Sequence, residues 1–157
     1  MILFLHILEI QMFFIENVSF ANMEKGYHYD PGENWAWISI ADIGHHFPQP
    51  KFTDYKDCLK LQFMDTDSGT EGCIQDHQVL AIVEFLAEQA RNKRNVLVNC
   101  HMGQCRSGAA AEAAQILGFE VTDTKRMPNS YVNKLLRYKI MELADQGKFE
   151  DIPEVRC

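Results

Sequence analysis

Basic residues are in the minority in this chain: 15 Lys and Arg stand against 22 Asp and Glu, which gives a net charge of −7 at pH 7. Nucleic acids and anionic membranes attract proteins with Lys- and Arg-rich surfaces, so neither is expected as a partner. The five cysteines form no CxxC motif and no cysteine–histidine pattern with zinc spacing. We therefore expect no metal ion and no other cofactor.

Long apolar runs are also missing. The first ten residues are mostly apolar, but His6, Glu9 and Gln11 interrupt this stretch before it reaches the length needed to cross a bilayer. It also lacks the basic start and the small-residue cleavage site of a signal peptide. We expect it to pack as one or two strands; if Met12 is a second start, residues 1–11 are an upstream extension.

No internal repeat and no interdomain linker divides the chain. Its 157 residues, 46% of them hydrophobic, are typical of one globular domain, so we expect a single, monomeric domain over 1–157 with a tail at 148–157. An odd number of cysteines without a disulfide pattern favours a reducing compartment, and a cytoplasmic location is expected.

Strands and helices alternate along the predicted chain. Short apolar runs predict strands at 13–16, 35–40, 58–63 and before Cys100, and 119–121 is a short strand or a loop. Helical periodicity or alanine content predicts helices from Asp76, over 109–117 and from Pro128 to Gly147, whereas 17–32 reads as a loop with room for one short helix. This alternation predicts an α/β fold with a mainly parallel central sheet flanked by helices.

The candidate catalytic residues lie in one strand–loop–helix turn. An apolar run, Val96–Val98, leads to Cys100, and Arg106 and Ser107 follow just before the alanine-rich helix that ends at Gly118. Such a turn directs backbone N–H groups and the positive helix end at one point, which suits an oxyanion. The Cys100 thiolate would be the nucleophile, Arg106 would hold two phosphate oxygens, and Ser107 would donate a hydrogen bond to the sulfur.

The segment Val98–Gly108 resembles the signature loop of the cysteine-dependent protein tyrosine phosphatases, and most of all the dual-specificity branch with its small bacterial and viral relatives. The resemblance spans about 36–146 and is strongest in the loop. It implies a tyrosine-phosphatase-like fold and a reaction through a cysteinyl-phosphate, without metal or cofactor. It also implies a phosphate-binding loop formed by His101, Met102, Gly103, Gln104, Cys105 and Arg106.

Two positions depart from the family pattern. Asn99 stands where the family usually has histidine before the nucleophile; an amide can still hydrogen-bond the loop, but it would stabilise the thiolate less. Cys105 stands where serine is common. It either captures an oxidised Cys100 as a disulfide or is a small buried side chain.

The leaving oxygen of the ester needs a proton, and an aspartate in a loop is suited to supply it. Asp65 follows the strand at 58–63 and lies 35 residues before Cys100, near the separation found in the family. Because ligands bind at the carboxyl ends of parallel strands, the Asp65 and Cys100 loops can share one cleft. Asp65 is the first candidate for the acid and Asp67 the second.

The expected substrate is a phosphorylated protein or peptide. The signature loop contains no lysine, so it does not resemble the loop of the lipid phosphatases. The acidic residues Asp65, Asp67, Glu71 and Asp76 favour phosphopeptides with basic neighbours. Selectivity between phosphotyrosine and phosphoserine or phosphothreonine stays open.

Two other functions remain as alternatives. A non-catalytic phospho-binding module would have kept the loop and lost efficient chemistry, as Asn99 suggests. A rhodanese-like sulfurtransferase or an arsenate reductase would also surround a cysteine with an anion-binding loop, although sulfur transfer requires no proton donor such as Asp65.

Overall fold

The computed structural model describes residues 11–26, 34–51 and 55–155. The elements follow in the order β1 (Phe14–Ser19), α1 (Phe20–Lys25), β2 (Trp35–Ala41), β3 (Cys58–Gln62), α2 (Asp76–Arg91), β4 (Asn95–Cys100), α3 (Arg106–Ala114), a 3₁₀ turn η2 (Gln115–Leu117), β5 (Glu120–Val121) and α4 (Ser130–Asp145). The predicted α/β fold is confirmed.

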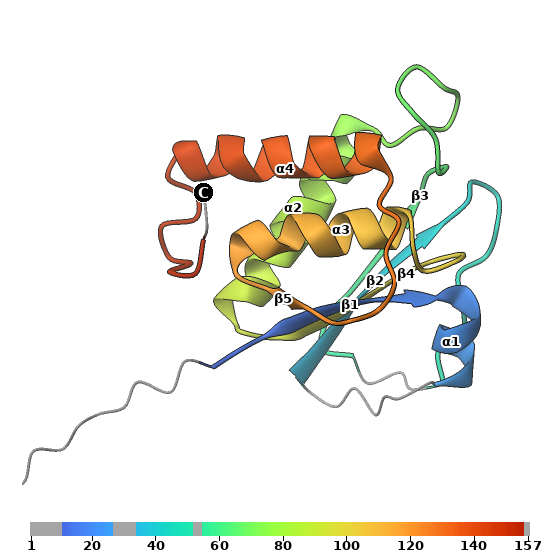
Figure 1. The fold of residues 1–157 in the computed structure, drawn as a ribbon, viewed down its shortest axis with the longest axis horizontal. Coiled ribbons are helices and arrows are strands. Elements are labelled where there is room, and N and C mark those ends of the chain that lie inside the picture. The colour runs from blue at the N-terminus through green and yellow to red at the C-terminus, as the bar shows by residue number, and fades with distance from the viewer. Residues whose placement is uncertain (1–10, 27–33, 52–54, 156–157) are drawn as a thin grey trace, which may run out of the picture.

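The five strands form one sheet in the order β3-β2-β4-β1-β5, and each neighbouring pair is parallel. Figure 1 shows α2, α3 and α4 over one face of this sheet, with α1 apart from them. The main core lies between that face and the three helices, where residues such as Ile38, Val98, Leu86 and Ala110 are fully buried. A smaller cluster on the other face contains Val18, Met23, Trp37 and Leu97.

The strand register brings the carboxyl ends of β1 to β4 to one edge. Ser19 at the end of β1 pairs with Cys100 at the end of β4, and Ala41 at the end of β2 pairs with Gln62 at the end of β3. The segments that follow these strands therefore lie next to one another. This edge holds the candidate site.

Several predicted boundaries are wrong. The strand expected at 13–16 continues to Ser19, because Asn17 and Val18 are buried against their neighbours, and α1 is the short helix for which the 17–32 segment had room. The helix expected over 109–117 begins earlier, at Arg106, and its last turn is the 3₁₀ turn η2. The last helix begins after Pro128, because Asn129 caps it by accepting a hydrogen bond from the Val132 backbone at 3.0 Å.

The C-terminal segment from Lys148 is not a free tail over its described part. It forms turns that bury Phe149 and Ile152 in the main core. The two apolar side chains explain this, since burial of each removes hydrocarbon surface from water. The strands expected in the first ten residues lie outside the described residues. None of the described helices has the length and apolarity needed to cross a membrane.

Candidate active site

Cys100 ends β4, the middle strand of the sheet, and the loop that follows leads directly into α3. Its side chain is 2% exposed. The Cys100 Sγ lies 3.1 Å from the Ser107 Oγ, so these two atoms share a hydrogen bond. Ser107, in the first turn of α3, is fully buried behind the sulfur and is placed to donate to it. Both residues thus lie where the sequence places them, Cys100 at the end of the strand and Ser107 in the first turn of the helix.

The loop between Cys100 and Arg106 is held by its neighbours through its carbonyl groups. The Phe20 backbone donates to the His101 carbonyl at 3.1 Å, and the Asn17 side chain donates to the Gly103 carbonyl at 2.7 Å. The Met127 and Asn129 backbones donate to the carbonyls of Gln104 and Cys105, each at 3.0 Å. These bonds direct the negative ends of the loop's peptide dipoles outward, which favours an anion inside the loop.

Gly103 lets the loop approach β1 closely. Its φ is +75°, and a Cβ at this position would lie 2.4 Å from the Ser19 nitrogen and the Val18 carbonyl carbon. A side chain would therefore be strained by its backbone conformation and would also clash with the backbone of β1. The tight contact explains why glycine stands at this point of the loop.

Arg106 is buried, with its residue 4% exposed. The Arg106 Nη1 donates to the Phe63 carbonyl at 2.6 Å and pairs with the Asp42 Oδ1 at 2.7 Å. The Nε of the same side chain is buried and has no hydrogen-bond partner in the described part of the chain. A buried N–H without a partner is costly, so an oxyanion that reaches it would gain a strong, charge-assisted bond.

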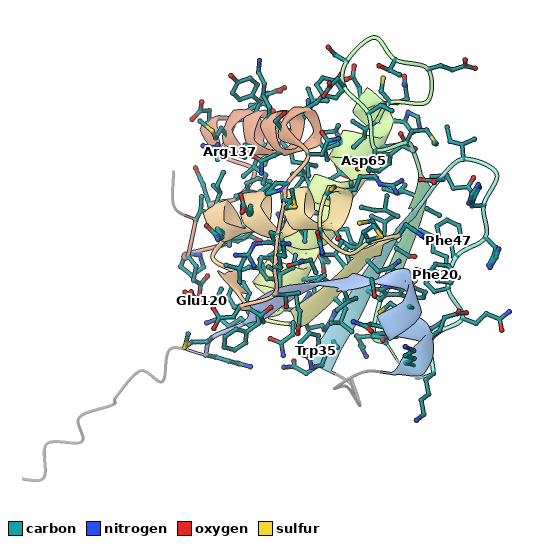
Figure 2. All side chains as sticks on the ribbon, turned by 45° about the vertical axis from the view of Figure 1, so that its right-hand side comes forward. Phe20, Trp35, Phe47, Asp65, Glu120 and Arg137 are labelled. Carbon is teal, nitrogen blue, oxygen red and sulfur yellow. The ribbon has the colours of Figure 1, made fainter. Side chains whose placement is uncertain are left out.

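Asp65 lies just beyond β3 on the same edge, where Figure 2 labels it. Its Oδ1 accepts a hydrogen bond from the Asn129 Nδ2 at 2.7 Å. The same Nδ2 lies 3.3 Å from the Thr66 carbonyl. Asn129 thus connects the Asp65 loop, the candidate phosphate-binding loop at 101–106 (below, the phosphate loop) and the first turn of α4.

A cavity of about 230 Å³ brings most of the predicted residues together; it is lined by Asp42, Met64, Asp65, Thr66, Cys100, His101, Met102, Cys105 and Arg106. Asp67 is not among these lining residues. Gly103 and Gln104 line a different cavity of about 470 Å³ on the β1 side of the loop. These two residues therefore do not line the cavity that contains Cys100.

Asn99 points away from the reactive sulfur. Its Oδ1 accepts a hydrogen bond from the Trp37 Nε1 at 2.8 Å, and its Nδ2 lies 3.5 Å from the Cys100 carbonyl. The amide therefore bridges β4 to β2 and reaches the backbone of Cys100. The side chain of Asn99 thus reaches the peptide group of Cys100 without reaching its sulfur.

Cys105 lies close to the candidate acid. Burial raises the pKa of the Cys105 thiol, and the Asp65 carboxylate raises it further through its charge and a hydrogen bond, against a lowering by Arg106. The thiol form of Cys105 is therefore favoured. As a donor to Asp65, this thiol is part of the acid's surroundings.

Sequence reasoning missed the residues that hold the site in place. Asp42 directly follows β2 at the edge where ligands are expected, and this position could have drawn attention to it. Asn129, one residue before α4, could have been recognised as a helix cap, but its bond to Asp65 spans 64 residues and leaves no local pattern.

No family model matches this chain, and no curated protein matches it. Within the described ranges, no group of three or more His, Cys, Asp or Glu side chains is arranged to hold a metal ion. The geometry alone defines the class of site: a buried cysteine beside a buried arginine, at the turn from the central strand into a helix.

Proposed function

We propose that the protein is a phosphatase that hydrolyses phosphomonoesters, and that its substrates are phosphorylated tyrosine, serine or threonine residues in proteins. One observation carries the proposal. Cys100, Asp65 and the buried Arg106, whose Nε lacks a partner, line the same cavity at the carboxyl edge of the sheet. The resemblance of residues 98–108 to the tyrosine phosphatase loop supports the same reaction.

In the first step the Cys100 thiolate attacks phosphorus while the bond from phosphorus to the ester oxygen breaks. Arg106 and the loop amides hold the non-bridging oxygens, and Asp65 gives its proton to the leaving oxygen. The hydrogen bond from the Asn129 Nδ2 to the Asp65 Oδ1 holds this carboxyl group at the site.

In the second step water attacks the cysteinyl-phosphate, and the bond from phosphorus to sulfur breaks. The Asp65 carboxylate takes a proton from the water, and Ser107, 3.1 Å from the sulfur, stabilises the departing thiolate. Phosphate leaves and the thiolate is restored. Because the reaction requires a reduced cysteine, we propose a cytoplasmic location.

The test is hydrolysis of an aryl phosphate across pH by the wild type and by Cys100→Ser, Asp65→Asn and Asp67→Asn. We expect Cys100→Ser to lose turnover and Asp65→Asn to lose its acidic rate optimum. Asp67→Asn is the matched control, since Asp67 does not line the cavity, and it should keep the wild-type profile.

Other outcomes would indicate another function. A wild type without turnover that binds vanadate, with loss of binding in Arg106→Ala, would identify a phospho-binding module. Unchanged activity in Asp65→Asn would favour a thiolate enzyme that needs no proton donor, such as a sulfurtransferase. Neither turnover nor anion binding would contradict the assignment of the loop.

A further inference from the structure

A second cavity adjoins the phosphate loop. It has a volume of about 180 Å³ and is lined by Phe20, Ile40, Ala41, Asp42, His45, His46 and His101. Its walls come from the start of α1, the end of β2 with the segment that follows, and the phosphate loop. Because β1 and β2 flank β4 in the sheet, these segments meet beside Cys100. The cavity shares Asp42 and His101 with the one that holds the reactive sulfur.

Aromatic rings form one side of this cavity. The Phe20 ring, labelled in Figure 2, meets the His46 ring edge to face, with centroids 5.6 Å apart. It lies 6.3 Å from the His101 ring. The hydrogen bond from the Phe20 backbone to the His101 carbonyl fixes α1 against the phosphate loop. The spacing between these rings is typical of an aromatic cluster to which a further ring could be added.

The residues that line the cavity determine which kind of group can bind in it. Asp42 is the only carboxylate in the lining, and its Oδ1 is already paired with Arg106 at 2.7 Å. The buried lining residues Ile40 and Ala41 are aliphatic. Because most of the lining is aliphatic or aromatic, an apolar group that enters this cavity is removed from water. An apolar cavity of about 150 Å³ is large enough for a benzene ring, so this one accommodates a single aromatic or branched aliphatic side chain.

We propose that this cavity is a specificity subsite, and that it binds an apolar side chain flanking the phosphorylated residue of a protein substrate. The inference rests on the proposed phosphatase function and adds a substrate class to it. The shared residues Asp42 and His101 place the subsite directly beside the phosphate, within reach of a neighbouring residue of the same peptide.

The test compares kcat/KM for phosphopeptides that carry Phe, Ser or Lys at each of the two positions on either side of the phosphorylated residue. We expect Phe to exceed Ser by about tenfold at one position, since burial of such a side chain is worth at least one tenfold step. Phe20→Ala and His46→Ala should remove the preference, while hydrolysis of p-nitrophenyl phosphate, which has no flanking residue, stays unchanged. His46 is exposed, so its variant tests the subsite even if Phe20→Ala fails to fold. Tyr138→Ala is the matched control, because Tyr138 is an exposed aromatic residue on α4 outside the cavity.

The outcomes separate the subsite from the proposed function. Equal rates for all flanking residues, a preference for Lys with no preference for Phe at any position, or a Phe preference that survives in both variants would overturn the subsite while leaving the phosphatase intact. If the wild type hydrolyses no phosphate ester, the phosphatase proposal fails. In that case the affinities of the same peptides, measured by fluorescence anisotropy, decide the subsite: tighter binding of the Phe peptide that is lost in His46→Ala supports it, and equal binding overturns it.

Discussion

Asn129 offers the sharpest test of how the candidate acid is held. In Asn129→Ser the hydroxyl can still accept from the Val132 backbone, as serine is a good helix cap, and the backbone bond to the Cys105 carbonyl is unaffected. The variant loses the Nδ2 that donates to the Asp65 Oδ1 at 2.7 Å and lies 3.3 Å from the Thr66 carbonyl. It therefore removes the hold on the acid and keeps the helix cap.

The magnitude follows from the exposure of Asp65. A hydrogen bond to a charged group contributes about 1.5–3 kcal/mol when it is shielded from water. Asp65 is exposed, so water replaces part of the lost bond and the cost falls to about 1 kcal/mol. If this energy positions the acid in the transition state, kcat/KM falls about fivefold.

The assay is kcat/KM for a series of substituted phenyl phosphates. Poor leaving groups require a proton from Asp65, so phenyl phosphate should show the full loss and p-nitrophenyl phosphate little or none. Asn133→Ser is the matched control: Asn133 lies one turn further along α4 and donates to the Ala109 carbonyl at 3.2 Å. A loss of equal size for every leaving group, or the same pattern in Asn133→Ser, would refute the reasoning.

Four further predictions concern the loop. Gly103→Ala should lower the free energy of unfolding by about 2–5 kcal/mol, because its φ is strained for alanine and its Cβ clashes with β1. Gly69→Ala, whose φ is similar but whose surroundings are open, should lower it by about 1–2 kcal/mol. Chemical denaturation measures both values. Arg106→Lys keeps the charge but loses the fork, so kcat should fall by about 10²–10³, and a loss below tenfold would contradict the role of the guanidinium. The raised pKa of the Cys105 thiol leaves less thiolate at a given pH, so alkylation of Cys105 should need a higher pH than alkylation of a free thiol. Asp65→Asn should shift this alkylation to lower pH. Mass spectrometry of variants that also carry Cys100→Ser measures the alkylation. Mild peroxide should give a Cys100–Cys105 disulfide if Cys105 captures the oxidised nucleophile, and oxidation of Cys100 to its sulfonic acid with Cys105 untouched would exclude that role.

The parts of the fold that the sequence predicts are the ones with a local signal. The apolar run at 96–98 and the alanine-rich segment after it mark β4 and α3, and their junction places Cys100, Arg106 and Ser107 together. The carboxyl-end rule for parallel sheets adds Asp65, because β3 and β4 end at the same edge. Local sequence patterns and the carboxyl-end rule thus account for the placement of the candidate catalytic residues.

The residues that support these groups depend on tertiary structure. Arg106 is held by Asp42 and by the Phe63 carbonyl. Every residue has a backbone carbonyl, so the sequence does not indicate which one will bind the arginine. The sequence from Lys148 onward predicts a tail. Phe149 and Ile152 are nevertheless buried, because they pack into the main core, a contact that the local sequence does not indicate. The end of β1 differs from the prediction for the same reason: Asn17 is polar, yet it is fully buried, where its amide donates to two backbone carbonyls.

The hydrogen bond between Trp37 and Asn99 gives the molecule an optical consequence. The chain has two tryptophans, and the indole N–H of one of them is bonded to the residue that precedes the nucleophile. Indole fluorescence depends on the hydrogen bonding of its N–H group, so a change at the Cys100 peptide alters the emission of Trp37. With Trp35 replaced by phenylalanine, we expect that emission to follow changes at Cys100 in real time and without an attached dye.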